Sequence, residues 1–441
     1  MHIVIFALFL CLNFNISTQT EEEKYIIIPI DCKKYTDFCV ISVSFGSKQQ
    51  TFEIQVDTTT SYTWIPSTKF SHNVKKYDIS KSNTGEITNT TVEITNIKGT
   101  IYGKACYDSI KISDISIPHF GFVLANDNCP NFKDYPQGKF GLGFLQEKKS
   151  FNPIQILKEN NIISKENFLI TKEYLLIGKL PSFLLQKFKH SYCPKIDISN
   201  LDPEYREAWA CHLSKIFFGV YNTTETEYIN GVEISKTSYI NLDIALDINA
   251  PVIFDSAYPY INIHKKYKNY VKENLVEKLL NDDCFEDKDE DYSTFFVCKT
   301  KNIKMKDNYM SFLINGKMYY LFGFNLFKKK GFDSYELLIR FTKKNNDVVI
   351  LGAPFLDFFS ASYDYECKKI TFFGELIKDF TELWNDYSKK KKRNRIILIV
   401  IAIFGVFLLF VYIHEKRKDK SPLFYVFEIY HTITPVRITS S

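Results

Sequence analysis

The stretch Glu53–Ser67, EIQVDTTTSYTWIPS, is an apolar run with strand-like alternation that ends at Asp57 and continues into hydroxyl residues. A second stretch, APVIFDSAYPYINI from Ala250, repeats this arrangement, with Asp255 followed by Ser256. Two carboxylates brought together cannot both ionise cheaply, so they share a proton. One can then activate water while the other protonates a carbonyl oxygen. Taken alone, an aspartate after an apolar run is common, so a catalytic pair and two ordinary turns both remain open.

The surrounding chain has mainly the periodicity of short strands between residues 25 and 378. Asn315-Gly316 separates two β-rich runs, and Asn-Gly is a strong hairpin signal because both residues tolerate positive φ. Apolar residues recur at three to four positions only in short stretches, namely 152–160, 181–190 and 265–280. The acidic stretch 281–293 is expected to be a surface loop closed by Cys284 and Cys298. These patterns predict a mostly β fold with a few short helices.

Both ends of the chain carry apolar segments. Residues 1–12 form a run too short to span a bilayer and precede small polar residues, which favours a secretory signal peptide over residues 1–19. An uncleaved anchor or a buried strand is the alternative. Residues 396–413 are uncharged over 18 positions and have basic flanks, which predicts a transmembrane helix. We therefore expect a single-pass protein of the secretory pathway or cell surface, with a juxtamembrane linker at 379–395 and a short tail at 414–441.

The net charge of +5 comes from the region around this predicted membrane segment. Residues 389–395 contribute +6 and residues 414–441 contribute +2, which leaves −3 for everything before Lys389. Lysines at a membrane boundary interact with anionic headgroups. The positive net charge therefore does not indicate a nucleic-acid partner.

Ten cysteines, one of them in the predicted signal peptide, indicate an oxidising compartment, and the remaining odd number leaves at least one thiol unpaired. Sequence cannot determine the pairing. The expectation that needs the shortest loops joins Cys32 with Cys39, Cys106 with Cys129, Cys193 with Cys211, and Cys284 with Cys298. Asn89 and Asn222 begin sequons that would suit glycosylation in the same compartment.

Several chemistries lack their sequence signals. There is no HExxH or CxxC spacing, so a metal site has little support. There is also no GxSxG motif and no glycine-rich phosphate loop, which disfavours serine hydrolases and nucleotide enzymes. We expect no cofactor and no metal.

Six motifs in order make the chain resemble the pepsin-like aspartic proteases, including the plasmepsins, over nearly all of residues 25–376. They are VDTTTSYTWIPS, ITNIKGTIYGKACYDSI, GKFGLGF, VIFDSAYPYI, FLINGKMYYL and VVILGAPFLDFF. The resemblance implies two β-rich lobes, at 25–193 and 194–378, with a substrate cleft between them. It also implies catalytic roles for Asp57 and Asp255, with further positions as follows: Thr58, Thr60 and Ser256 support the dyad, and Asn96, Gly99, Thr100 and Tyr258 belong to the flap and cleft.

The chain departs from the family pattern at five of these motif positions. Thr59 and Ala257 replace the glycine that follows each Asp-hydroxyl pair, and Asn96 replaces the flap tyrosine. Tyr258 stands where a hydroxyl residue is usual, and Lys139 where an apolar residue is usual. A β-branched threonine in place of glycine crowds the loop and is the most damaging change.

These departures leave three functions open. The first is a membrane-tethered, monomeric aspartic endopeptidase that cleaves polypeptides of the secretory pathway or cell surface. The second is a catalytically impaired protein of the same fold that binds a peptide or protein partner in its cleft. The third is a structural surface antigen.

Overall fold

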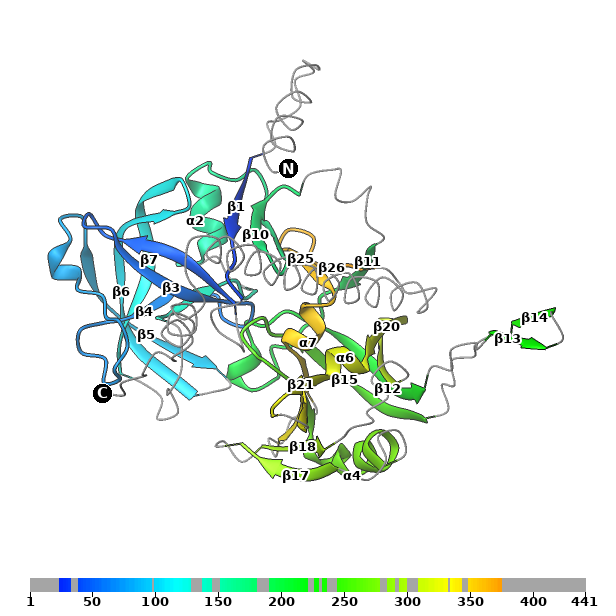
Figure 1. Cartoon of the computed structure of the whole chain (residues 1–441). Helices are drawn as coiled ribbons and strands as arrows, with labels where there is room; N and C mark the ends of the chain where they lie inside the picture. Colours follow the sequence, from blue (N-terminus) through cyan, green and yellow to red (C-terminus); the bar gives the residue numbers. More distant parts are fainter. Residues whose placement is uncertain are drawn as a thin grey trace, which may run out of the picture. The chain divides into compact units, whose positions relative to one another are not determined.

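The structure is a computed structural model (Figure 1). It describes residues 24–32, 39–96, 99–127, 137–144, 151–180, 190–220, 226–229, 232–235, 244–277, 284–289, 293–299, 308–331, 334–342 and 348–374. The predicted signal peptide, juxtamembrane linker, transmembrane segment and tail lie outside these ranges, as do Cys129, Asn222 and the helical pattern at 181–189. Among the described residues, no helix combines the length and apolarity needed to cross a membrane.

The first half of the described chain forms a sheet of seven strands in the order β2-β3-β8-β4-β7-β6-β5, with β2 also pairing β6. In β3 the alternate residues Phe52, Ile54 and Val56 are buried, as expected for a strand with one face in the core. The strands are β2 Val40–Phe45, β3 Gln50–Asp57, β4 Trp64–Pro66, β5 Glu86–Asn96, β6 Gly99–Ile112, β7 Ile115–Asp127 and β8 Lys139–Gly141.

The second half forms a larger sheet in the order β20-β19-β12-β15-β24-β16-β23-β18-β22-β21, with β17 beside β18. Its strands are β12 Ala210–Val220, β15 Ile244–Phe254, β16 Ile261–His264, β17 Cys284–Lys288, β18 Thr294–Lys299, β19 Asn308–Ile314, β20 Lys317–Phe322, β21 Phe327–Lys329, β22 Ser334–Leu337, β23 Ile339–Thr342 and β24 Val349–Leu351. A separate hairpin joins β13 Thr226–Ile229 and β14 Val232–Ser235.

The Asn-Gly prediction is confirmed by the hairpin of β19 and β20. Asn315 and Gly316 connect the two strands with φ of 48° and 74°, the positive values that a two-residue hairpin turn of this kind requires.

A third sheet combines strands from both halves, in the order β1-β10-β9-β25-β26-β11. In Figure 1 the late strands β25 and β26, in orange, lie near the early strands β1 and β10. Its strands are β1 Tyr25–Pro29, β9 Asn167–Ile170, β10 Tyr174–Gly178, β11 His190–Pro194, β25 Ser360–Asp364 and β26 Lys369–Phe373. β11 spans the expected boundary between the lobes, and residues up to Ile377 form one compact unit.

The helices are short. α2 spans Pro153–Glu159 and begins at Asn152, whose side chain accepts hydrogen bonds from the backbone N–H groups of Ile154 and Gln155. This helix and the segment 265–277 confirm two of the helical patterns. The remaining elements are η1 Ile79–Lys81, η2 Pro203–Tyr205, η3 Lys265–Tyr267, α4 Lys268–Val271, the π-helical turn η4 Lys272–Glu277, α6 Gly323–Leu326 and α7 Ala353–Leu356.

Three predicted disulfides are formed, joining Cys32 to Cys39, Cys193 to Cys211, and Cys284 to Cys298. The prediction for Cys106 is wrong, since this cysteine is a buried free thiol. Cys106 lies opposite Phe122 in the pairing of β6 with β7, and β7 continues to Asp127, which carries the chain away from Cys106 before residue 129.

The acidic stretch 281–293 also differs from its prediction as a loop. Residues 284–288 form β17, which pairs with β18 so that Cys284 lies directly opposite Cys298. The disulfide therefore links two neighbouring antiparallel strands, and Glu286 and Asp287 lie on a strand at the sheet's border.

Candidate active site

The loop that carries Asp57 begins where β3 ends. Gly141 and Gly143 allow the backbone of the GKFGLGF segment to pack closely against this loop. A Cβ on Gly141 would lie 2.4 Å from the carbonyl oxygen of Tyr62, and one on Gly143 would lie 2.6 Å from the carbonyl carbon of Thr60. The N–H of Leu142 donates to the Asp57 carbonyl oxygen at 2.7 Å. Only glycine permits this approach, which explains why the GKFGLGF motif crosses behind the aspartate.

The loop that carries Asp255 is built in the same way at the end of β15. The N–H of Asp255 donates to the carbonyl oxygen of Leu351 at 3.2 Å, and the N–H of Ala353 donates to that of Tyr258 at 2.8 Å. A Cβ on Gly352 would lie 2.1 Å from the Tyr258 carbonyl oxygen. The second glycine motif therefore supports the second aspartate loop.

Four reciprocal hydrogen bonds join the two loops, and we call this set the grip. The Thr58 hydroxyl donates to the carbonyl oxygen of Phe254 at 2.7 Å and accepts from the N–H of Ser256 at 3.0 Å. The Ser256 hydroxyl donates to the carbonyl oxygen of Val56 at 2.8 Å and accepts from the N–H of Thr58 at 3.2 Å. The grip places the residues that follow Asp57 and Asp255 side by side, although they are far apart in sequence.

Each carboxylate accepts a hydrogen bond from its own loop. The N–H of Ala257 donates to Oδ1 of Asp255 at 2.8 Å, and the N–H of Thr59 donates to Oδ1 of Asp57 at 2.8 Å. The Thr59 hydroxyl donates to the same oxygen of Asp57 at 2.6 Å. Threonine at this position thus adds a donor to the first carboxylate that the second loop, with alanine, does not have.

Lys139 forms a buried ion pair with the other oxygen of Asp57, Oδ2. Asp57 is 0% exposed and Lys139 is 6% exposed, so water screens this pair very little. Burial by itself raises the pKa of Asp57, but the Lys139 charge and the hydrogen bonds from Lys139 and Thr59 outweigh it and hold the pKa below its ordinary value. The contacts of Asp57 therefore favour its ionised form.

Comparison with known proteins agrees with this geometry. A family model described as eukaryotic aspartyl protease matches residues 39–374, about three quarters of the chain. The chain belongs to the eukaryotic aspartyl protease family. Pepsin A of Gallus gallus is 34% identical over 109 residues, which cover 23% of this chain and 30% of that protein. Procardosin-B of Cynara cardunculus is 30% identical over 111 residues, covering 24% and 22%. The chain thus matches less than a third of the length of these curated relatives.

The hairpin of β5 and β6 contains the residues that the sequence predicts for the flap. Asn96 pairs with Gly99 across the turn, and the hydroxyls of Thr95 and Thr100 lie 3.3 Å apart. Residues 97 and 98 and the side chain of Asn96 lie outside the described part. β5 also lies against η2, which belongs to the segment after β11.

Tyr258 is packed beneath that same segment. It is 7% exposed and belongs to a buried apolar cluster with Tyr205, Ile198 and Ile253. Its ring meets that of Tyr260 edge to face at 5.8 Å between centroids. The departure at position 258 thus places a large aromatic side chain in the core beside Asp255.

Three further polar contacts support the loops. The N–H and hydroxyl of Ser61 both donate to Oε2 of Glu207, at 2.8 and 2.7 Å. The amide of Gln55 donates to the carbonyl oxygen of Ala257 at 3.1 Å. The Thr60 hydroxyl accepts from the N–H of Tyr62 at 3.4 Å. Glu207 and Gln55 were not singled out from the sequence, because their partners come from the other half of the chain.

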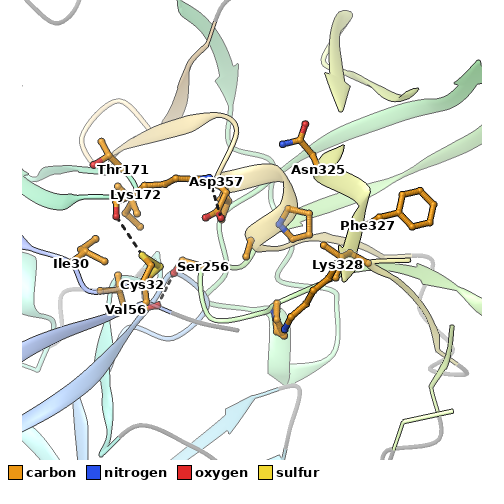
Figure 2. Close-up of a pocket in the computed structure, with 17 residues that line it drawn as sticks. Ile30, Cys32, Val56, Thr171, Lys172, Ser256, Asn325, Phe327, Lys328 and Asp357 are labelled. Atoms are coloured by element: carbon orange, nitrogen blue, oxygen red, sulfur yellow. Dashed lines mark hydrogen bonds and ion pairs between the residues drawn. A yellow bond between two sulfur atoms is a disulfide. The ribbon is translucent and has the colours of Figure 1, made fainter. Parts of the chain in front are cut away.

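A cavity of about 340 Å³ lies behind the grip (Figure 2). Val56 and Ser256 line it, and neither Asp57 nor Asp255 does. Lys172 and Asp357 face each other across it with a 3.6 Å ion pair, and the Cys32–Cys39 disulfide contributes to its wall. Burial raises the pKa of Asp357, and the Lys172 charge opposes this effect. The cavity is therefore separate from the two carboxylates.

Within the described ranges, no group of three or more His, Cys, Asp or Glu side chains is arranged to hold a metal ion. Asn89, the sequon residue in β5, is exposed.

Proposed function

We propose that the protein is an aspartic endopeptidase in which Asp57 and Asp255 activate water to cleave a peptide bond. The observation that carries the proposal is the grip, because its four hydrogen bonds are the means of holding two aspartate loops together. Each carboxylate also accepts an N–H from its loop, which orients the two side chains.

In the proposed reaction, the pair begins with one shared proton. One carboxylate takes a proton from water as the water oxygen bonds to the peptide carbonyl carbon, and the protonated partner gives its proton to the carbonyl oxygen. The tetrahedral diol then collapses: one carboxylate takes the proton of a hydroxyl, the other carboxyl group protonates the nitrogen, and the C–N bond breaks. The pair again holds one proton.

The disulfides and the apolar segments of the sequence support a proposal for the compartment in which the enzyme acts. The three disulfides suit a lumenal or extracellular compartment. The apolar segments at 1–19 and 396–413 motivate the proposal that the enzyme is tethered to a membrane and acts on polypeptides of the secretory pathway or cell surface.

A second candidate is a cleft that binds a peptide or protein without cutting it. The ion pair of Asp57 with Lys139 favours this candidate, because a carboxylate that already accepts three hydrogen bonds is a weaker base. The full burial of Asp57 favours it as well.

Turnover by the purified full-length protein tests the choice. We expect cleavage of a peptide library at some pH between about 3 and 7, abolished by Asp57→Ala and by Asp255→Ala. If a folded sample cleaves no peptide over this range and both variants still bind a peptide ligand, the second candidate, a binding protein, is correct instead.

A further inference from the structure

Lys139 reaches Asp57 from β8, the strand that runs parallel to β3. The pairing places Gln55 beside Lys139, Val56 beside Phe140, and Asp57 beside Gly141. Lys139 therefore lies two residues before the glycine that supports the Asp57 loop, and its side chain ends on the carboxylate.

The second half of the molecule contains the same arrangement without a lysine. β15 runs parallel to β24, with Ile253 beside Ile350 and Phe254 beside Leu351, and Gly352 follows. Ile350, which is 1% exposed, thus occupies the position that Lys139 occupies in the first half. The neighbours correspond too, since Trp64 pairs with Lys139 and Asn262 pairs with Ile350.

The second half of the molecule shows that the backbone of such a loop forms without a charged residue at this position. An apolar residue fills the position beside Asp255 and the loop there still forms, so the backbone arrangement does not require an amine. Burying an ammonium group carries a large desolvation cost unless it is paired. Lys139 compensates that cost through Asp57.

We infer that Lys139 is a positioning residue that keeps Asp57 as a carboxylate, so that the proton shared by the pair resides on Asp255. The catalytic consequence rests on the proposed endopeptidase function, whereas the protonation state does not.

The ionisable groups around the pair support this assignment. Lys139 approaches Asp57 from β8, and Glu207, on the segment before β12, is held at Ser61. Tyr363 of β25 is fully buried, and burial raises the pKa of its phenol, so this group adds no charge beside the pair. Lys139 is the cation in direct contact with the carboxylate, and it offsets the repulsion that Asp57 would otherwise exert on an ionised Asp255.

The expected consequence is confinement of turnover to acidic pH. With Asp57 neutralised by Lys139, Asp255 loses its proton at a lower pH than in a pair of bare carboxylates. Proton transfer from water to Asp57 is also less favourable beside an ammonium group. Lys139 thus lowers activity near neutral pH.

The test replaces Lys139 in the full-length protein with the residue that the second half uses, Lys139→Ile. Lys139→Met serves as a second variant of similar length, and Lys139→Arg keeps the charge. Lys215→Met is the matched control, because Lys215 pairs with Asp247 at 2.9 Å in an exposed position. Two measurements are made: kcat/KM against pH, and titration of the Asp57 carboxyl carbon in protein labelled with 13C, assigned by its loss in Asp57→Asn.

We expect the neutral variants to move the basic limb of the kcat/KM profile upward by about one pH unit or more, which is about tenfold in rate at a fixed pH above the limb. Lys139→Arg should keep the position of the basic limb because it keeps the charge, and Lys215→Met should keep the whole wild-type profile. The Asp57 carboxyl should titrate at higher pH in the neutral variants.

An Asp57 titration that is the same in wild-type protein and in folded Lys139→Ile or Lys139→Met would overturn the inference, with or without turnover. If the wild-type protein shows no turnover but the titration moves, the endopeptidase proposal fails and the assignment of charge stands. If the titration moves and the pH profile does not, the catalytic consequence is wrong.

Discussion

The loops at Asp57 and Asp255 share a backbone and differ in the charge around their carboxylates. Both follow a strand, both rest on a glycine that permits close backbone contact, and both contribute a hydroxyl to the grip. Thr59 and Lys139 surround Asp57, whereas Ala257 and Ile350 hold the corresponding positions beside Asp255. The shared glycines and the grip therefore set where the carboxylates lie. The side chains that differ between the two loops set which carboxylate binds the proton.

The largest expected effect comes from removing either carboxylate. Asp57→Asn and Asp255→Asn should each lower kcat at least 100-fold, because an amide can neither accept the proton of water nor share one with its partner. Steady-state hydrolysis of a peptide substrate measures this. If Asp57→Asn retained wild-type kcat while Asp255→Asn lost it, the two loops would differ in function as well as in charge.

The shared backbone can be tested through its glycines. Gly141→Ala and Gly352→Ala should each reduce the free energy of unfolding by about 3 kcal/mol, since the new methyl group would meet backbone atoms that cannot easily move. Gly316→Ala is the control, because nothing lies within 4 Å of its Cβ position and only its positive φ resists substitution, at about 1 kcal/mol. Denaturant unfolding gives the values, and a large difference between the two loop variants would contradict their equivalence.

The lowered pKa of Asp57 predicts how stability depends on pH. The folded protein binds fewer protons than the unfolded chain, so the stabilisation is fully present above the unfolded pKa, about 4, and is lost as pH falls through the lower folded pKa. The stability difference between wild-type protein and Asp57→Asn should therefore shrink on acidification below pH 4. Asp247→Asn, in an exposed ion pair, should change stability little at any pH. A difference that stayed constant down to the acid transition would show that Lys139 and Thr59 do not favour the charged form.

The smallest effect should come from making the first loop resemble the second. Thr59→Ala removes the hydroxyl that donates to Asp57 and keeps the N–H that does so. We expect a loss of stability of about 1 kcal/mol above pH 5, the net contribution of one hydrogen bond, and a small upward shift of the Asp57 titration. Thermal unfolding and the 13C titration measure the two effects. An unchanged titration would assign the charged form of Asp57 to Lys139 alone.

Much of the fold could be predicted because its signals are local. The alternation before Asp57, the Asn315-Gly316 turn and the helical spacing at 152–160 each depend on neighbouring residues. The family motifs then supplied the order of the elements. Cys106 was assigned wrongly because pairing by short separation ignores the register of β6 with β7.

The candidate site was harder to predict because its contacts join distant segments. Lys139 could be noted from the sequence as a charge at an apolar position, but its contact with Asp57 depends on the parallel pairing of β3 with β8. Thr59 was expected only to crowd the loop, and the direction of its hydroxyl toward Asp57 could not be read from its identity. Ser61 and Glu207 meet only because the two halves of the chain are packed together.

The sheet that combines β1, β10 and β9 with β25, β26 and β11 has a consequence for the order of folding. Asn167 pairs with Asp364, so the sheet cannot be completed until nearly all of residues 25–374 have been synthesised. Contacts of such long sequence separation slow folding, because the loop must close before the pairing stabilises it. An incomplete chain lacking β25 and β26 would leave β9 without its neighbour and expose an unpaired strand edge, which favours aggregation. We therefore expect a nascent chain that ends before Phe373 to aggregate more readily than the complete chain.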